Sequence, residues 1–343
     1  ICYNGFMDIM PKGGEEKRVG ITRIHMEEDA GKSIHDFSDD DSLIDFNRCG
    51  VPLIEIVSEP DMNSSAEAFA YLQKIKQLLI WLGINDGNME EGSLRCDANI
   101  SIRPVGIKEF GTRTEIKNLN SFKNVVDAIE AEITRQSAIL DRGEKVVYHT
   151  MTYNAKDRTT TPTRSKEEAH GYRYFPEPDL VYVEVNEERK SKIREALPEL
   201  PAEKRNRFVT EYSLPEYDAD VLTQDKEVAD FFERVTSELS DRSGKNFKSV
   251  SNIVMKEVMR VLKEDKIDIS NFPISPVNTA KLVGLVSDGT INNNTSKEVF
   301  GIMLAEKGKE PGEIIKEKDL VQVTDESAIE DVIKKILSEH KNE

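Results

Sequence analysis

Residues 92–103 read "GSLRCDANISIR", and their alternation decides how the first half of the chain folds. One set of alternate positions is apolar: Leu94, Cys96, Ala98, Ile100 and Ile102. The other set is polar: Arg95, Asp97, Asn99, Ser101 and Arg103. A period of two residues is typical of a half-buried β-strand. We therefore predict a strand here, with one polar face left for function.

Three other segments predict strands. "RTEIKNL" (113–119) repeats the alternation and places Glu115 and Lys117 on one face. "KRVGITRIHME" (17–27) and "VPLIEIVS" (51–58) are the other two. In the last of these, Glu55 stands alone among branched aliphatic residues, where an ionised carboxylate is costly unless it is paired or bound to a metal.

Two helices are expected between these strands. Ser64 and Glu67 have the spacing of a capping box, and Gly83 ends the apolar stripe that follows. A second helix is predicted from Ser121 to Leu140. Because strands and helices mix without strict βαβ alternation, the fold class is α+β.

The composition changes near residue 190, where proline and charged residues become frequent and strand patterns disappear. A helical stripe follows at Val250, Val254, Val258 and Val261. Breaks at 272–278 and 291–296 precede a last helical piece. We predict a mixed domain over 1–190, a helical domain over 191–290, and the start of a helical tail over 291–343.

Bulk composition excludes several protein classes. No apolar run approaches the roughly 20 residues of a membrane helix, so no membrane partner is expected. The three cysteines are too widely spaced for a disulfide framework or a zinc site, which favours the cytoplasm. The chain begins at Ile1 within an apparent strand, so we expect preceding residues to be missing.

The formal charge of −17 argues against a protein that coats nucleic acid through bulk electrostatics. Residues 241–266 are an exception, with seven basic against four acidic residues. Lys248, Lys256 and Arg260 in this stretch are candidate contacts for RNA. The alternative is an ordinary solvated helix face.

The sequence "HMEEDAGKS" (25–33) ends like a phosphate-binding P-loop, in Gly31-Lys32-Ser33. The P-loop pattern needs a glycine five residues before Gly31, and that position is Met26. The acids inside the segment would also repel phosphate. A P-loop is therefore excluded.

The acids remain to be explained. Glu27 and Glu28 end a predicted strand, beside His25. Asp97 and Glu115 project from polar strand faces near Arg95 and Lys117. No cluster of cysteine or histidine accompanies the carboxylates, which are Glu27, Glu28, Glu55, Asp97 and Glu115. Such oxygen ligands favour Mg²⁺, which usually comes with substrate phosphates. Salt-bridged strand residues are the alternative.

Five motifs together resemble one family, the B subunit of the bacterial tRNA-dependent amidotransferase. They are "RIHMEEDAGKS" (23–33), "DFNRCGVPLIEIVSEPD" (45–61), "MEEGSLRCDANIS" (89–101), "TEIKNLNSF" (114–122) and "YRYFPEPDL" (172–180). The resemblance runs from about residue 20 to 180 and is looser beyond. It implies a strand-rich, cradle-like catalytic domain followed by helical domains that hold tRNA.

The resemblance also implies a reaction. ATP and Mg²⁺ phosphorylate the side-chain carboxylate of Glu-tRNA(Gln) or Asp-tRNA(Asn), and ammonia from a partner amidase (glutaminase), the A subunit, displaces the phosphate. A small helical partner, the C subunit, completes the enzyme, a carbon–nitrogen ligase with glutamine as amido donor.

Carried over by position, the implied metal ligands are Glu27, Glu28, Glu55, Asp97 and Glu115. Glu28, Arg95 and Lys117 are the catalytic candidates. Arg95 and Lys117 would lie beside the acids, and from their charge we infer that they bind the nucleotide as phosphate clamps. Arg173, Tyr174 and Glu177 belong to a family motif whose task the residues do not reveal.

The chain departs from the family pattern in two places. It lacks a "GLEVH"-like motif that contributes to the family's metal site, and its tail stops early, so we interpret the sequence as a fragment. Two other functions stay open, a non-catalytic tRNA-binding scaffold and a free-standing Mg²⁺/ATP amide ligase. The residues do not decide between the two misacylated tRNAs.

Overall fold

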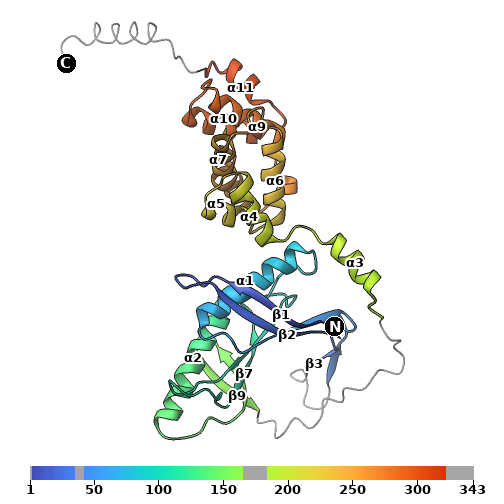
Figure 1. Ribbon diagram of the computed structural model, residues 1–343, viewed down its shortest axis with the longest axis vertical. Helices are drawn as coiled ribbons and strands as arrows, with labels where there is room; N and C mark the ends of the chain where they lie inside the picture. The colour runs from blue at the N-terminus through green and yellow to red at the C-terminus, as the bar shows by residue number, and fades with distance from the viewer. Residues whose placement is uncertain (1, 35–41, 165–183, 322–343) are drawn as a thin grey trace, which may run out of the picture. The chain divides into compact units, whose positions relative to one another are not determined.

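The computed structural model describes residues 2–34, 42–164 and 184–321, and it divides into two compact units, Ile1–Lys190 and Ser191–Glu343. The first unit contains the strands and two long helices, and the second is helical (Figure 1). The predicted α+β class is therefore confirmed. The further division of the second unit at residue 290 stays a prediction.

Strands β1 (Cys2–Ile9), β2 (Lys17–Glu28) and β5 (Pro52–Ser58) form the first sheet, in the order β1-β2-β5 with both pairs antiparallel. Helix α1 (Ser65–Trp81) packs on one face of it. The shared core consists of Met7, Ile9, Val19, Tyr71, Ile75 and Leu79. Strands β3 (Lys32–Ile34) and β4 (Leu43–Asp45) form a separate two-stranded ladder.

The second sheet has the order β6-β7-β8-β9, with β6 (Cys96–Ile100), β7 (Thr114–Leu119), β8 (Thr150–Asn154) and β9 (Thr159–Arg164). Strands β7 and β8 are parallel, so the chain must cross over between them, and helix α2 (Phe122–Asp141) makes that connection. Its buried residues pack on the apolar face of the sheet, around Ile116, Leu119 and Met151.

The strand predicted over 92–103 is real but shorter. Cys96 and Ala98 pack against the core while Asp97 and Asn99 are exposed, as the alternation predicts. The strand ends at Ile100 because a side chain from α2 takes over its backbone groups. The Gln136 amide donates to the Ile100 carbonyl at 3.0 Å and accepts from the Ile102 N–H at 3.2 Å.

The start of α1 differs in part from the predicted capping box. Ser64 is the N-cap, and its hydroxyl accepts from the Glu67 N–H at 3.2 Å. The Glu67 carboxylate does not return to Ser64; it accepts from the Asn63 N–H and from Lys17, both at 2.7 Å. Lys17 opens β2, so this ion pair ties the helix start to the first sheet. Gly83, with φ of +66°, follows the helix as predicted.

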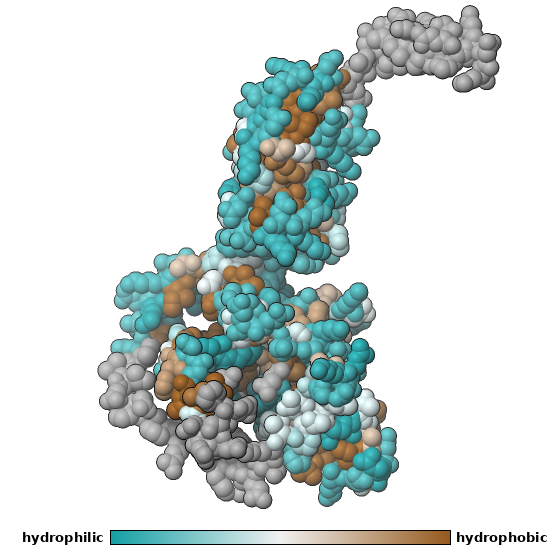
Figure 2. All heavy atoms as spheres, turned by 180° about the vertical axis from the view of Figure 1, so that it is seen from behind, coloured by the Kyte–Doolittle hydropathy of each residue, from teal (hydrophilic) through white to brown (hydrophobic). Residues whose placement is uncertain are grey.

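The second unit contains short helices in sequence. They are α3 (Glu187–Ala196, which begins before the boundary), α4 (Pro201–Glu211), α5 (Glu216–Leu222), α6 (Lys226–Ser237), α7 (Gly244–Ile253), α8 (Met259–Asp265), α9 (Pro276–Ser287), α10 (Asn293–Ala305) and α11 (Pro311–Glu317), with a 3₁₀ turn η2 (Ile269–Asn271). Their surface in Figure 2 is mostly hydrophilic, with apolar atoms emerging between the helices. No helix among the described residues is long and apolar enough to cross a membrane.

Helices α7 and α8 are joined by a π-helical segment, η1 (Val254–Val258). The predicted stripe runs along all three: Val250, Val254, Val258 and Val261 are at most 4% exposed. From Val250 to Val254 and from Val254 to Val258 the stripe advances by four residues, which is more than the 3.6 residues of one α-helical turn. A π turn contains more residues than an α-helical turn, so it takes up the difference and the valines stay on the buried side.

Candidate active site

The acids of the first sheet lie at the ends of β2 and β5. The register pairs His25 with Glu55, Glu27 with Leu53, and Glu28 with Pro52. Since successive strand residues point to opposite faces, Glu27 shares a face with His25 and Glu55, whereas Glu28 belongs to the other face. Glu27 and Glu28 are exposed, and no ion pair is formed by either within the described residues. Their adjacency in sequence therefore does not make them one ligand pair.

Glu55 is more exposed than its apolar neighbours in the sequence suggested. Its side chain is 50% exposed, and β5 is an edge strand of the first sheet among the described residues. The Arg23 guanidinium lies 3.4 Å from it on the same face. The carboxylate in this apolar strand is therefore half exposed and paired with Arg23.

The acids of the second sheet are gathered around one lysine. Lys117 Nζ lies 3.2 Å from Asp97 Oδ2 and 3.2 Å from Glu115 Oε1. Partial burial works to lower the pKa of Lys117, but the two carboxylates outweigh it and the pKa is raised. The three side chains therefore form a compact charged face, with Asn99 beside Glu115 across the ladder.

A buried carboxylate supports this face from below. Glu132 on α2 is fully buried and accepts from the hydroxyls of Thr114 at 2.6 Å and Thr160 at 2.7 Å. Arg135 pairs with it at 2.6 Å, and the Gln136 amide donates to it at 2.9 Å. Burial alone would raise the pKa of Glu132, yet Arg135 and the three neutral donors lower it. Thr114 directly precedes Glu115, so the network fixes the backbone that carries the charged face.

Arg95 does not join Asp97 or Glu115. Its guanidinium bonds Asp29, which also lies 3.0 Å from Nε of Arg48. The Asp29 side chain is only 13% exposed. Burial opposes its ionisation, but the hydrogen bond and charge of Arg95, helped by Arg48, hold the pKa of Asp29 below its usual range. Asp29 follows β2 and Arg95 precedes β6, so this cluster joins the acidic end of the first sheet to the second.

Asp29 and Arg48 are functional candidates that the sequence analysis missed. Arg48 also donates to the carbonyl oxygens of Glu91 at 3.2 Å and Gly92 at 3.0 Å. Gly92 has φ of +75°, a left-handed conformation that favours glycine at this turn. The only sequence signal was that Asp29 is the third of three consecutive acids at the end of β2, and its partners are distant in sequence.

The carboxylates are grouped in pairs. Glu27 and Glu55 share one face of the first sheet, and Asp97 and Glu115 share the Lys117 face of the second. Among the residues that the structure describes, no three His, Cys, Asp or Glu side chains are placed to hold a metal ion together. Pairs of carboxylates suit Mg²⁺ that comes with substrate phosphates and water, rather than an all-protein cage.

Cys96 and the "RYFPEPD" motif complete the candidate residues. Burial, with the charge of Asp97 adding to it, raises the pKa of the Cys96 thiol to about 12. That thiol stays protonated and is no nucleophile. Arg173, Tyr174 and Glu177 lie outside the described residues.

Two protein-family models match this chain, one in each unit. The family model for the GatB/GatE catalytic domain matches residues 1–191, and the family model for the GatB domain matches residues 230–343.

The chain belongs to the GatB family.

Three relatives illustrate the similarity, and each is named as the B subunit of an aspartyl/glutamyl-tRNA(Asn/Gln) amidotransferase. The Salinibacter ruber protein is 48% identical over 99% of this chain and 70% of its own length. The Oleidesulfovibrio alaskensis protein is 49% identical over 100% of this chain and 71% of its own. The Chlorobium limicola protein is 51% identical over 98% and 69%. The resemblance drawn from the five motifs is confirmed, and it extends over the helical unit as well.

Proposed function

We propose that this GatB chain activates the side-chain carboxylate of Glu-tRNA(Gln), Asp-tRNA(Asn) or both with ATP, and passes it to ammonia to give the amide. The observation that carries this proposal is the similarity of 47–51% identity, over at least 98% of the chain, to the B subunits of amidotransferases. The proposed enzyme class is a carbon–nitrogen ligase with glutamine as amido donor.

The chemistry needs an activation step. A carboxylate oxygen does not leave when ammonia attacks, so it must first become part of a better leaving group. Transfer of the γ-phosphoryl group of ATP to that oxygen gives an acyl phosphate and ADP. Attack of ammonia on the acyl carbon then breaks the carbon–oxygen bond, releases phosphate and, after loss of a proton, leaves the amide.

The charged face of the second sheet suits the handling of phosphate. The Lys117 side chain is 44% exposed, so it can still contact an anion while Asp97 and Glu115 hold it in place. A positioned cation stabilises charge that develops on a transferring phosphoryl group. We propose this role for Lys117.

Arg95 is the second proposed clamp. Its side chain is 52% exposed and is anchored by Asp29 at one edge of its guanidinium. An arginine presents donors on several edges, so one edge can bond Asp29 while another meets phosphate. Glu28, exposed near this pair, stays the acidic catalytic candidate.

The proposed cofactors are ATP and Mg²⁺. Oxygen ligands from Glu27 with Glu55, from Glu28, and from Asp97 with Glu115 would hold the metal, which would neutralise phosphate charge when bound. The donor chemistry fits this cation.

The proposed partners follow from the reaction. We propose that ammonia comes from a partner, as it does in the reaction that the resemblance implies. We propose an amidase and a small helical protein, the A and C subunits of a heterotrimer, as companions, with misacylated tRNA as substrate. Translation in the cytoplasm is the setting that this substrate implies.

The test is ATP turnover by the assembled complex, without any ammonia source. ADP release would be measured with Glu-tRNA(Gln), with Asp-tRNA(Asn), with uncharged tRNA and with free glutamate. We expect release only with a misacylated tRNA. Turnover with free glutamate alone would favour the small-molecule ligase, and absence of turnover with every substrate would favour the scaffold.

A further inference from the structure

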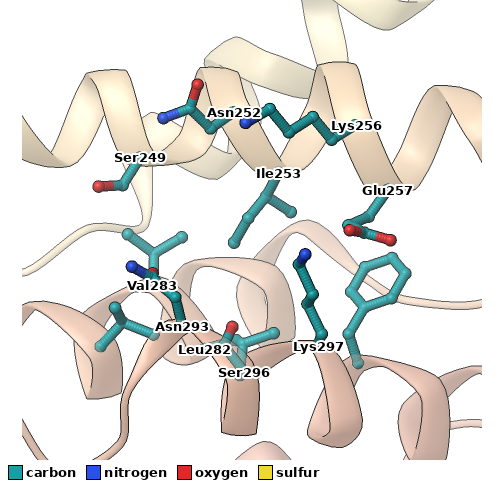
Figure 3. A pocket seen from close by; sticks show the side chains of 12 residues that line it. Ser249, Asn252, Ile253, Lys256, Glu257, Leu282, Val283, Asn293, Ser296 and Lys297 are labelled. Carbon is teal, nitrogen blue, oxygen red and sulfur yellow. The ribbon is translucent and has the colours of Figure 1, made fainter.

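The helical unit has a groove of about 280 Å³ that is separate from the acids of the sheets. One wall is α7 with η1, which contribute Asn252, Ile253 and Lys256; the other is α9 with α10, which contribute Val286 and Lys297. Figure 3 shows Lys256 lying along its helix toward Asn252, while Lys297 rises from the opposite wall into the space between the helices.

The two lysines are the notable charges of this groove. Within the described residues, Lys256 and Lys297 form no ion pair, and both are exposed. The other basic residues proposed for RNA contact differ. Lys248 pairs with Asp218, and Arg260 pairs with Glu264 at 2.6 Å. Although the whole chain has a charge of −17, the two lysines on facing walls create a local positive potential that attracts an anion.

One acid also lines the groove, but it is already paired. Glu257 lies 3.3 Å from Arg260, and its side chain is 20% exposed. Arg260 therefore offsets part of the charge of Glu257, since the same guanidinium also pairs with Glu264. Asn252, Asn293, Ser249 and Ser296 supply the remaining polar groups of the lining.

Both walls also contribute apolar residues, which together are called the floor of the groove. They are Ile253, Leu282, Val283, Val286 and Phe300. A phosphate held between the lysines would leave this floor uncovered, because a phosphate has no apolar surface to bury. A nucleobase would cover it and would bring ring nitrogen and carbonyl groups near the asparagine amides. The volume lies just below the range of about 300–1,000 Å³ for small-ligand pockets, which suits one base better than a helix.

The π turn explains how these groups come to share one wall. Lys256 and Glu257 are both on η1, between valines that stay buried on either side. The extra residue of a π turn changes which side chains face outward, and such turns occur frequently at functional sites.

We infer that this groove binds one unstacked nucleotide from a single-stranded part of the tRNA. The base lies on the apolar floor, the amides of Asn252 and Asn293 meet its edge, and Lys256 and Lys297 contact the flanking phosphates. This inference rests on the proposed function, which supplies the RNA. Sequence-specific recognition of RNA targets unstacked bases of loops in this way.

The test measures binding of labelled Glu-tRNA(Gln) to the assembled complex over a series of salt concentrations. Lys256→Ala and Lys297→Ala should each weaken binding about fivefold and lower the salt slope by about 1. Val286→Trp fills the groove from a half-buried position and should weaken binding about tenfold without changing the slope. Lys316→Ala, an exposed lysine on α11 outside the groove, is the matched control and should bind like the wild type.

Asn252→Ala is a second test of base binding, in case Val286→Trp does not fold. It should weaken binding about threefold and leave the salt dependence unchanged. Wild-type affinity in Val286→Trp and Asn252→Ala would overturn base insertion even if the lysine variants weakened. Unchanged tRNA binding with weakened assembly would make the groove a protein-docking surface and overturn the inference.

The same preparations separate the two proposals. Wild-type complex that releases no ADP with misacylated tRNA contradicts the proposed function. Wild-type complex that is active, with groove variants that bind tRNA normally, contradicts only the inference about the groove.

Discussion

The two sheets of the first unit present their acids in different ways. On the first sheet, Glu27 and Glu28 are exposed and point to opposite faces. On the second, Asp97 and Glu115 are held 3.2 Å from Lys117, above the buried Glu132 network. The comparison indicates different tasks for the two sheets. The charged face of the second sheet is preorganised by its own ion pairs, whereas Glu27 and Glu28 on the first sheet are exposed to a ligand.

The largest effect is expected from the support beneath the second sheet. Glu132→Ala leaves Arg135 and the hydroxyls of Thr114 and Thr160 without their acceptor in a buried position. We expect a loss of about 3–5 kcal/mol in the free energy of unfolding, measured by chemical denaturation.

The matched control for that variant is an exposed pair in the same unit. Glu144→Ala removes the partner of Arg142, and both side chains are more than half exposed. Its loss should be much smaller than that of Glu132→Ala, because solvent screens an exposed ion pair. Equal losses in the two variants would show that the Glu132 network does not support the second sheet.

Lowering the pH tests whether the Glu132 carboxylate is charged in the folded chain. The pKa of Glu132 is lowered in the folded chain, so its contribution is present above the unfolded pKa of about 4.3 and is lost as pH falls through the folded value. The stability difference between wild type and Glu132→Gln should therefore shrink below about pH 4. A difference that stays constant from neutral pH to about pH 3, in a denaturation series, would contradict a charged Glu132.

A smaller effect is expected at the junction of the two sheets. Asp29→Asn keeps the shape of the side chain but removes the charge that Arg95 and Arg48 share. Because both arginines are 41% or more exposed, we expect a loss of only about 1 kcal/mol. Hydrogen exchange should speed up near the end of β2. Unchanged exchange there would mean that the junction does not hold the strand end.

The smallest effect is expected on the exposed first sheet. Arg23→Gln breaks a pair with Glu55 in which both side chains are at least 41% exposed. The free energy of unfolding should change by less than about 0.5 kcal/mol. A loss comparable to that of Glu132→Ala would remove the distinction between the two sheets.

Local pattern predicted much of this fold. The alternation over 113–119 correctly placed Glu115 and Lys117 on one face, because strand periodicity needs no distant contact. Strands β8 and β9 had no such signal. Their sequences, "TMTYN" and "TTTPTR", are largely polar, and Pro162 lies in an edge strand. They form strands only through pairing, β8 with β7 and β9 with β8.

The sequence supplied candidate residues for the site but did not predict how they are arranged. The same alternation that grouped Glu115 with Lys117 separates Glu27 from Glu28, and the set of five acids did not allow for that. Arg95 looked like a neighbour of Asp97, but its partner Asp29 lies 66 residues away. The exposure of Glu55 depends on the position of β5 in its sheet. These facts come from tertiary contacts, which a single sequence does not contain.

The most direct test of the account is ADP release by the assembled complex with Glu-tRNA(Gln) and no ammonia, compared between wild type, Glu115→Gln and Glu298→Gln. Glu298 is an exposed acid on α10, remote in sequence from the sheets. We predict a drop of about 100-fold for Glu115→Gln and none for Glu298→Gln, because only the former lies on the Lys117 face. Wild-type turnover in Glu115→Gln would contradict the assignment of that face to carboxylate activation.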